Sequence, residues 1–239
     1  MILLTGSSAY DLKISSEKLP GRRGRGRDII YLPLSFNEFL KGFQIDIKRI
    51  SLTDFLNLSM EDLKNFETKL SFLKRYFDIY WNTGGVPFAV NEFLENGVLK
   101  NETFIIITDL ILGDAEKYLK TRLRIRELLT KLPRIIGHIA EMIVLRYLIK
   151  DSEDVEDGLN LYMGPFYWHS NKGNEIDFIA ERENKLVPVE VKYQNRIAKS
   201  DYFGVKKVFG QGIIVTKDTV FKDQGITGAP LWLFIALVE

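Results

Sequence analysis

The sequence predicts a mixed α/β protein with a mostly helical N-terminal part and a C-terminal part built on strands. Three patterns support this prediction. Residues 60–81 and 132–149 place apolar side chains at helical spacing. Residues 174–180 and 186–194 alternate apolar and polar side chains, as half-buried strands do. The apolar run 231–237 is expected to form the last strand.

The first 50 residues begin with an apolar segment, 1–8, that is expected to form a strand ending in small hydroxyl residues. A glycine-interleaved cluster of arginines follows, with no acid before Asp28: Arg22, Arg23, Arg25 and Arg27. Glycines let a backbone approach phosphates closely and arginines bind them bidentately. DNA, RNA or a nucleotide phosphate are therefore candidate ligands, and a solvated loop is the alternative.

Residues 51–132 are expected to be mostly helical. A short helix is expected to start at Ser35, a second near Leu52, and a longer one to run from Met60 to Trp81. The Gly-Gly-Val-Pro sequence at 84–87 should end that longer helix. A basic helix follows, and it offers either a solvent face or a face for a duplex: Lys117, Lys120, Arg122, Arg124, Arg126 and Lys131.

The segment 132–149 reads as a helix that is apolar almost all round, and hence buried. Glu141 is the only acid in it. A buried carboxylate needs a cation, a metal or hydrogen-bond donors. Pairing with Arg134 or Arg146 is the alternative to a functional role. An acidic loop, 151–158, should connect this helix to the strands.

Acids and a lysine are expected to share one face of the predicted hairpin. On the first strand, Ile176, Phe178 and Ala180 should point to one side and Glu175 and Asp177 to the other. On the second, alternation places Glu190, Lys192 and Gln194 together, opposite the valines.

Two carboxylates on neighbouring strands form a hard-oxygen site for Mg²⁺ or Mn²⁺, and a lysine can assist the attacking water. Asp177, Glu190 and Lys192 thus indicate phosphodiester hydrolysis. The alternative is a solvated strand face with a cross-strand ion pair.

An apolar helix with Glu141, a strand with Asp177 and a strand with Glu190-Val-Lys192 together resemble the PD-(D/E)XK nuclease superfamily. Within that superfamily, the sequence resembles the domains found at the C-terminus of archaeal AAA-type ATPases. The resemblance spans residues 134–239. It implies a central mixed β-sheet flanked by helices. It also implies Mg²⁺ ligation by Glu141, Asp177 and Glu190, a catalytic role for Lys192, and a DNA contact by Gln194. No proline precedes Asp177.

The N-terminal part resembles the sensor strand, arginine loop and helical lid of the same ATPases. The phosphate-binding loop G-x-x-x-x-G-K-[ST] does not occur in the sequence, so no autonomous ATP binding is expected. The winged-helix unit common in such proteins has no room between the lid-like helices and residue 135. We predict an ATPase remnant at 1–132 and a nuclease-like domain at 133–239.

Composition fits a protein of the reducing cytoplasm. The 239 residues carry a net charge of +1, no cysteine and two histidines, which excludes disulfides and a histidine-built metal centre. No apolar run is long enough for a membrane span, and no signal peptide is indicated. Abundant Ile, Lys and Glu with four Gln points to a thermophile.

Three functions remain open on sequence grounds. The leading one is a Mg²⁺-dependent, DNA-acting nuclease. The second is a noncatalytic nucleic-acid-binding or regulatory module that has kept the fold. The third is part of an ATPase whose phosphate-binding half lies on a complementary polypeptide.

Overall fold

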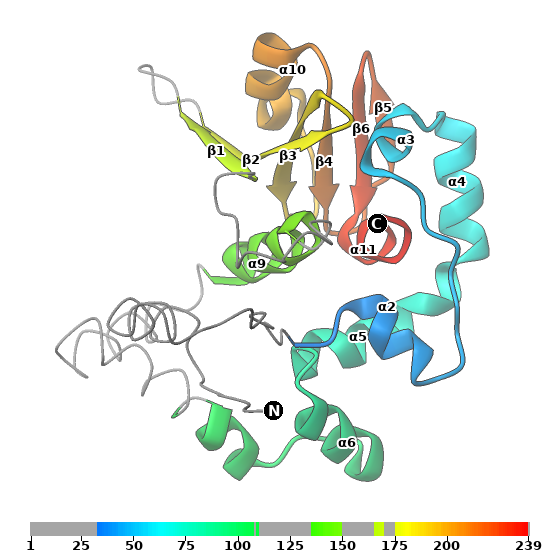
Figure 1. The fold of residues 1–239 in the computed structure, drawn as a ribbon, viewed down its shortest axis with the longest axis vertical. Helices are drawn as coiled ribbons and strands as arrows, with labels where there is room; N and C mark the ends of the chain where they lie inside the picture. Colours follow the sequence, from blue (N-terminus) through cyan, green and yellow to red (C-terminus); the bar gives the residue numbers. More distant parts are fainter. Residues whose placement is uncertain (1–32, 108, 110–134, 150–164, 170–174, 239) are drawn as a thin grey trace, which may run out of the picture.

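The computed structural model describes residues 33–107, 109, 135–149, 165–169 and 175–238. Within these ranges the protein is a mixed α/β fold, as the sequence predicts (Figure 1). The segment 1–8, the arginine cluster at 22–27, the basic helix at 117–131 and the acidic loop at 151–158 lie outside the described residues.

A six-stranded sheet organises the C-terminal part, in the order β1-β2-β3-β4-β6-β5. The antiparallel pairs are β1/β2, β2/β3 and β5/β6, and the parallel pairs are β3/β4 and β4/β6. The strands are β1 (Phe166–His169), β2 (Glu175–Arg182), β3 (Lys185–Lys192), β4 (Gly212–Thr216), β5 (Phe221–Asp223) and β6 (Ile226–Pro230).

The helices before the sheet begin where the sequence provides capping side chains. Ser35 and Ser59 each form a capping box with the acid three residues on, and Ser51 accepts a hydrogen bond from the Asp54 amide. These helices are α2 (Phe36–Lys41), α3 (Leu52–Asn57), α4 (Met60–Lys69), the 3₁₀ turn η1 (Ser71–Leu73), α5 (Lys74–Thr83) and α6 (Pro87–Asn96).

The predicted single helix from Met60 to Trp81 is two helices, because the chain leaves helical geometry at Leu70 and passes through η1. The apolar period continues across the break because Leu63, Leu73 and Phe77 line the same core. The predicted break at 84–87 is confirmed: Gly84 ends α5 in the left-handed region and Pro87 begins α6.

The remaining helices lie around the sheet: α9 (Ile135–Ile149), the 3₁₀ turn η5 (Lys199–Tyr202), α10 (Phe203–Phe209) and α11 (Leu231–Leu237). α9 and α11 belong to a large core with α2, α3, α5 and the valines of β3. α10 packs with Ile176, Ile179 and Ile214 in a smaller core. Because Ile214 alternates along β4 with Ile213 and Val215 of the large core, the two cores lie on opposite faces of the sheet.

The prediction that residues 231–237 form a strand is wrong. They form α11, and every one of its side chains is buried. A run that is buried on all sides has no amphipathic period, so its sequence cannot tell a strand from a core helix.

α9 matches the predicted helix, but the described part of it is not buried all round. Met142 is 69% exposed, whereas Ala140 and Val144 are fully buried. One side of the helix therefore packs on the sheet and another side is accessible.

Residues on both sides of the predicted boundary at 132/133 contribute to the large core. Phe55 of α3 meets Phe234 of α11 edge to face, with ring centroids 5.4 Å apart. Ile50 forms a parallel β-bridge with Val238. The boundary stays a prediction, but the helices of 33–107 and the sheet are packed as one body.

Candidate functional site

A β-bulge shapes β2 at the candidate site. Phe166 faces Ile179 across β1/β2, but Trp168 faces Ile176, so β2 carries one extra residue between them. Ile176 packs in the smaller core, whereas Phe178 and Ala180 belong to the large one. The predicted common face of Ile176, Phe178 and Ala180 is therefore wrong, because a bulge breaks strict alternation.

Asp177 lies in this bulge, next to Glu190 of β3. The regular β2/β3 ladder begins at the pair Phe178 and Val189. Beyond that pair, side chains bond to the backbone of the neighbouring strand. The Val191 amide donates to Asp177 Oδ2 at 2.7 Å, and the Asp177 amide donates to Glu190 Oε2 at 3.2 Å. The two carboxylates thus connect the strands at this point.

The predicted face of β3 is confirmed. Val187, Val189 and Val191 are buried in the large core, so alternation places Glu190 and Lys192 on the opposite side. Lys192 Nζ donates to Glu190 Oε1 at 2.5 Å. Glu190 is only 5% exposed, whereas the Lys192 side chain is 31% exposed, so the ion pair is buried at its acidic end and partly open to water at its basic end.

The electrostatics of Asp177 show an excess of negative charge. Burial raises the pKa of Asp177 to about 6, and the charge of Glu190 acts in the same direction. The Glu141 carboxylate raises it further, whereas the Val191 amide and Lys192 oppose the rise. Glu141 of α9 is therefore within electrostatic reach of Asp177.

Lys192 has a raised pKa. Burial lowers it, but the hydrogen bond to Glu190 and the charges of Glu190, Asp177 and Asp201 outweigh that effect. The side chain is thus an ammonium group at neutral pH. Such a group donates hydrogen bonds and stabilises negative charge, and it does not act as a base.

The carboxylates of the site have the hard oxygen atoms that Mg²⁺ or Mn²⁺ prefers as ligands. Asp177 Oδ1 accepts no hydrogen bond from any described residue, and a cation there would oppose the two largest effects that raise the Asp177 pKa, which are burial and the charge of Glu190. Within the described ranges, however, no three His, Cys, Asp or Glu side chains are grouped closely enough to hold a metal. Ligation by Glu141, Asp177 and Glu190 together stays a prediction.

Arg134 and Arg146 are the predicted alternative partners of Glu141, and the structure describes only Arg146. Arg146 donates through Nε and Nη2 to the Pro33 carbonyl, at 2.9 and 2.7 Å, and lies 3.4 Å from Glu38. Arg134 lies outside the described residues.

Gln194, predicted to contact DNA, has a partner within the protein. Its Nε2 donates to Asp201 Oδ2 at 2.8 Å, although the side chain is exposed. The arginines predicted to bind nucleic acid, Arg22, Arg23, Arg25 and Arg27, lie outside the described residues.

The structure adds Tyr167 to the site, which the sequence gives no sign of. Desolvation raises the pKa of Tyr167, as do its hydrogen bond to Glu175 and the charges of Glu175, Asp177 and Glu190. Tyr167 stands on the edge strand β1 and is 59% exposed.

Comparison with protein families gives one match. Residues 136–234, less than half of the chain, match the model of a domain of unknown function, DUF4143. This domain is found in proteins associated with AAA-type ATPases, which agrees with that part of the predicted resemblance. The match gives no support to nuclease activity or to an archaeal source. No curated protein and no solved structure matched the sequence.

Proposed function

We propose that this protein acts on DNA through a Mg²⁺- or Mn²⁺-dependent phosphodiester-hydrolysing site formed by Asp177, Glu190 and Lys192, with Glu141 as a further ligand. The observation that carries the proposal is the bulge at Asp177. It places a carboxylate with a raised pKa beside a second carboxylate that is bonded to an ammonium group. Bulges next to active sites commonly re-aim a side chain in this way.

The residues of the site divide the chemistry between them. In hydrolysis, water attacks phosphorus, the bond to the leaving oxygen breaks, and negative charge builds up on the phosphate oxygens. Lys192 is held against Glu190 and donates hydrogen bonds to that developing charge. Asp177 and Glu190 would supply oxygen ligands to a bound Mg²⁺. A bound Mg²⁺ would polarise the phosphate and lower the pKa of its water.

Cleavage of supercoiled plasmid and branched DNA by the purified protein tests this proposal. With Mg²⁺ or Mn²⁺ the protein should nick or cut the DNA, and EDTA should stop the reaction. Lys192→Ala should lower the rate by about 100-fold or more, since it removes transition-state stabilisation, while DNA affinity changes little. Lys185→Ala, at the exposed opposite end of the same strand, is the matched control and should cleave normally.

A noncatalytic DNA-binding module is the second candidate. Both oxygens of Glu190 are bonded within the protein, to Lys192 and to the Asp177 amide, so a structural role also accounts for this buried carboxylate. A wild-type protein that never cleaves with either metal, and binds DNA as tightly as Lys192→Ala does, would favour this module.

An ATPase partner is proposed on separate grounds, because the matched domain occurs in ATPase-associated proteins. We propose a complementary polypeptide that carries the phosphate-binding loop. Co-purification that restores ATP hydrolysis would support it. Micromolar ATP affinity of the chain alone, measured by calorimetry, would contradict it.

A further inference from the structure

The segment that follows the site lysine concentrates positive charge. Residues 192–207 contain five basic side chains and one acid, Asp201, in a chain whose net charge is +1. Lys206 is paired with Asp223 at 3.1 Å, and Lys192 with Glu190. The basic side chains that remain are Arg196, Lys199 and Lys207, all of them exposed.

Three exposed residues of η5 and α10 are named the stripe: Lys199, Phe203 and Lys207. η5 and α10 are continuous in sequence from Lys199 to Phe209. Phe203 and Lys207 lie four residues apart in α10, which is close to one helical turn, whereas Lys199 lies in the 3₁₀ turn η5, whose last residue, Tyr202, departs from helical geometry. Phe203 is 60% exposed, and Lys207 Nζ lies 5.7 Å from the centre of its ring. An exposed aromatic ring thus stands beside a lysine.

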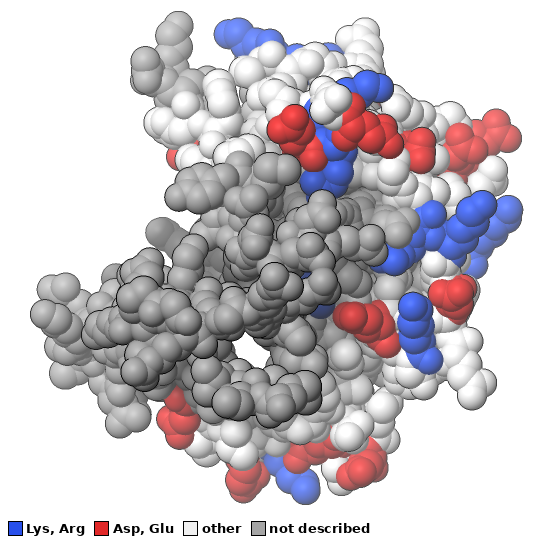
Figure 2. All heavy atoms as spheres, in the orientation of Figure 1, with Lys and Arg blue, Asp and Glu red and all other residues white. Residues whose placement is uncertain are grey.

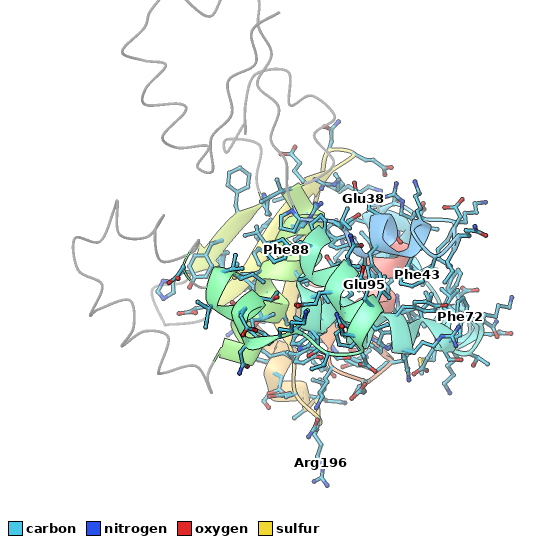
Figure 3. All side chains as sticks on the ribbon, turned by 90° about the horizontal axis from the view of Figure 1, so that it is seen from below. Glu38, Phe43, Phe72, Phe88, Glu95 and Arg196 are labelled. Atoms are coloured by element: carbon cyan, nitrogen blue, oxygen red, sulfur yellow. The ribbon has the colours of Figure 1, made fainter. Side chains whose placement is uncertain are left out.

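Arg196 extends this stripe from a loop that is held in place. Asp201 Oδ2 accepts hydrogen bonds from Gln194 Nε2 at 2.8 Å and from the Ala198 amide at 2.7 Å. At the other side of the loop, Lys217 Nζ donates to Asn195 Oδ1 at 3.0 Å. Between these two ties, Arg196 projects away from the body of the protein (Figure 3). Asp201, the one acid of residues 192–207, therefore holds the loop that carries Arg196 in place.

The stripe belongs to the same side of the sheet as Glu190 and Lys192, whereas α9, which carries Glu141, packs on the other face. Tyr202 and Val205, on the inner side of this helical run, pack with Ile176 and Ile179 of β2. Glu190 and Lys192 point to this same side, away from the valines of the large core. Asp201 is close enough to Lys192 to raise its pKa, so η5 lies beside the site.

We propose that Arg196, Lys199, Phe203 and Lys207 form a nucleic-acid-binding surface that holds the phosphate backbone as it leads to the Asp177–Glu190–Lys192 site. The cations would contact phosphates and Phe203 would contact a sugar or an unpaired base. The proposal rests on the proposed function for the chemistry at the end of this path, but binding to the surface requires neither metal nor cleavage.

A nucleic acid fits this surface better than an anionic membrane. Membrane-surface helices present a broad apolar face below their basic residues. Here Val205 of α10 is buried against the sheet, and the exposed side of α10 carries Lys207 with only two large apolar side chains, Phe203 and Val208. The continuity with a phosphate-directed site also favours a chain of phosphates.

Fluorescence anisotropy in EDTA with a labelled DNA duplex and a labelled single strand tests the proposal. The variant Arg196→Ala/Lys199→Ala/Lys207→Ala should lose about tenfold or more in affinity at low salt, because three phosphate contacts are removed. The slope of log affinity against log salt should flatten by about 2–3 units on the duplex. Phe203→Leu should weaken the single strand more than the duplex.

A matched control removes the same charge elsewhere. In Figure 2, basic side chains gather alongside α4, where Lys64 and Lys69 are exposed. Lys48→Ala/Lys64→Ala/Lys69→Ala should leave affinity and salt slope near the wild-type values. Circular dichroism and thermal unfolding should show both triple variants folded.

Three results would overturn the proposal. One is an equal loss of DNA affinity in both triple variants. Another is unchanged DNA binding in the stripe variant. The third is loss of binding to phosphatidylserine vesicles by the stripe variant while its DNA binding stays intact. Failure of the proposed function looks different, because a wild type that never cleaves could still bind DNA through the stripe.

Discussion

Asp177 is the residue at which burial and charge act against folding. Its carboxyl lies in the β2 bulge beside Glu190, and its pKa is raised to about 6 from an ordinary value of 3.8. A carboxyl with a raised pKa binds more protons in the folded than in the unfolded state between those two values. Its contribution to stability is therefore present at low pH and is lost as the pH rises through about 6.

Replacing Asp177 by Asn should stabilise the protein at pH 7.5 without metal. Asparagine keeps an oxygen for the Val191 amide and removes the charge, so we expect a gain on the order of 1–2 kcal/mol. Near pH 4 the two proteins should be almost equally stable. Urea unfolding at both pH values measures the difference. A less stable Asn variant at pH 7.5 would show that the negative charge is already compensated.

Mg²⁺ binding at Asp177 should stabilise the folded protein. Metal binding to the folded state raises its stability by mass action, so millimolar Mg²⁺ should raise the Tm of the wild type at pH 7.5. Glu190→Gln/Asp177→Asn should show no such rise, since it lacks the charged oxygens. Equal shifts in both proteins, measured by differential scanning fluorimetry, would place any bound Mg²⁺ elsewhere.

At the scale of the element, a substitution at Gly228 tests how closely β5 and β6 pack. Gly228 of β6 pairs with Phe221 of β5, and a Cβ added there would stand 2.0–2.6 Å from the Phe221 ring. The ring thus occupies the space that a side chain at 228 would need.

Gly228→Ala should therefore destabilise the protein by about 2–3 kcal/mol, because strand and ring have to separate. Gly204→Ala is the matched control. A Cβ at 204 meets nothing within 4 Å, and Gly204 lies in α10, so this change should be neutral or stabilise by about 0.5 kcal/mol. Chemical denaturation of both variants measures the pair. Similar losses in the two would mean that Phe221 moves aside at little cost.

The strands at the site were predictable to different degrees. β3 could be read in full, because Val187, Val189 and Val191 alternate without interruption and place Glu190 and Lys192 opposite. In β2 the acid was found, but the orientation of Ile176 was not, because a bulge depends on how β1 pairs and leaves no mark in β2 itself. α11 was misread because full burial hides the helical period. Asp201 of η5 and Tyr167 of the edge strand β1 approach the site through tertiary packing, which no local pattern encodes.

At the scale of the whole molecule, contacts between distant segments tie the helices of 33–107 to the sheet. Lys222 Nζ and Thr227 Oγ1 donate to the Leu56 carbonyl, at 2.8 and 2.6 Å. The Tyr147 hydroxyl accepts from the Phe36 amide at 2.5 Å.

Among the helices in the described ranges, none has the length and apolarity that a membrane span needs.

Phe55→Ala should show whether these contacts make one cooperative unit. Phe55 is fully buried against Phe234, so its truncation should cost about 3–5 kcal/mol. Circular dichroism and tryptophan fluorescence should then report one coincident unfolding transition at lower denaturant. Two separate transitions would instead support the predicted boundary at 132/133.

The burial of α11 also affects how the protein is made. Phe55 of α3 has its partner, Phe234, almost 180 residues later in the chain. At about 5–20 residues per second, translation separates the two by on the order of 10 to 35 s. Throughout that interval the apolar sides of α2 and α3 lack the helix that covers them in the finished fold. The nascent chain should therefore need chaperones before the ribosome has synthesised residues 231–237.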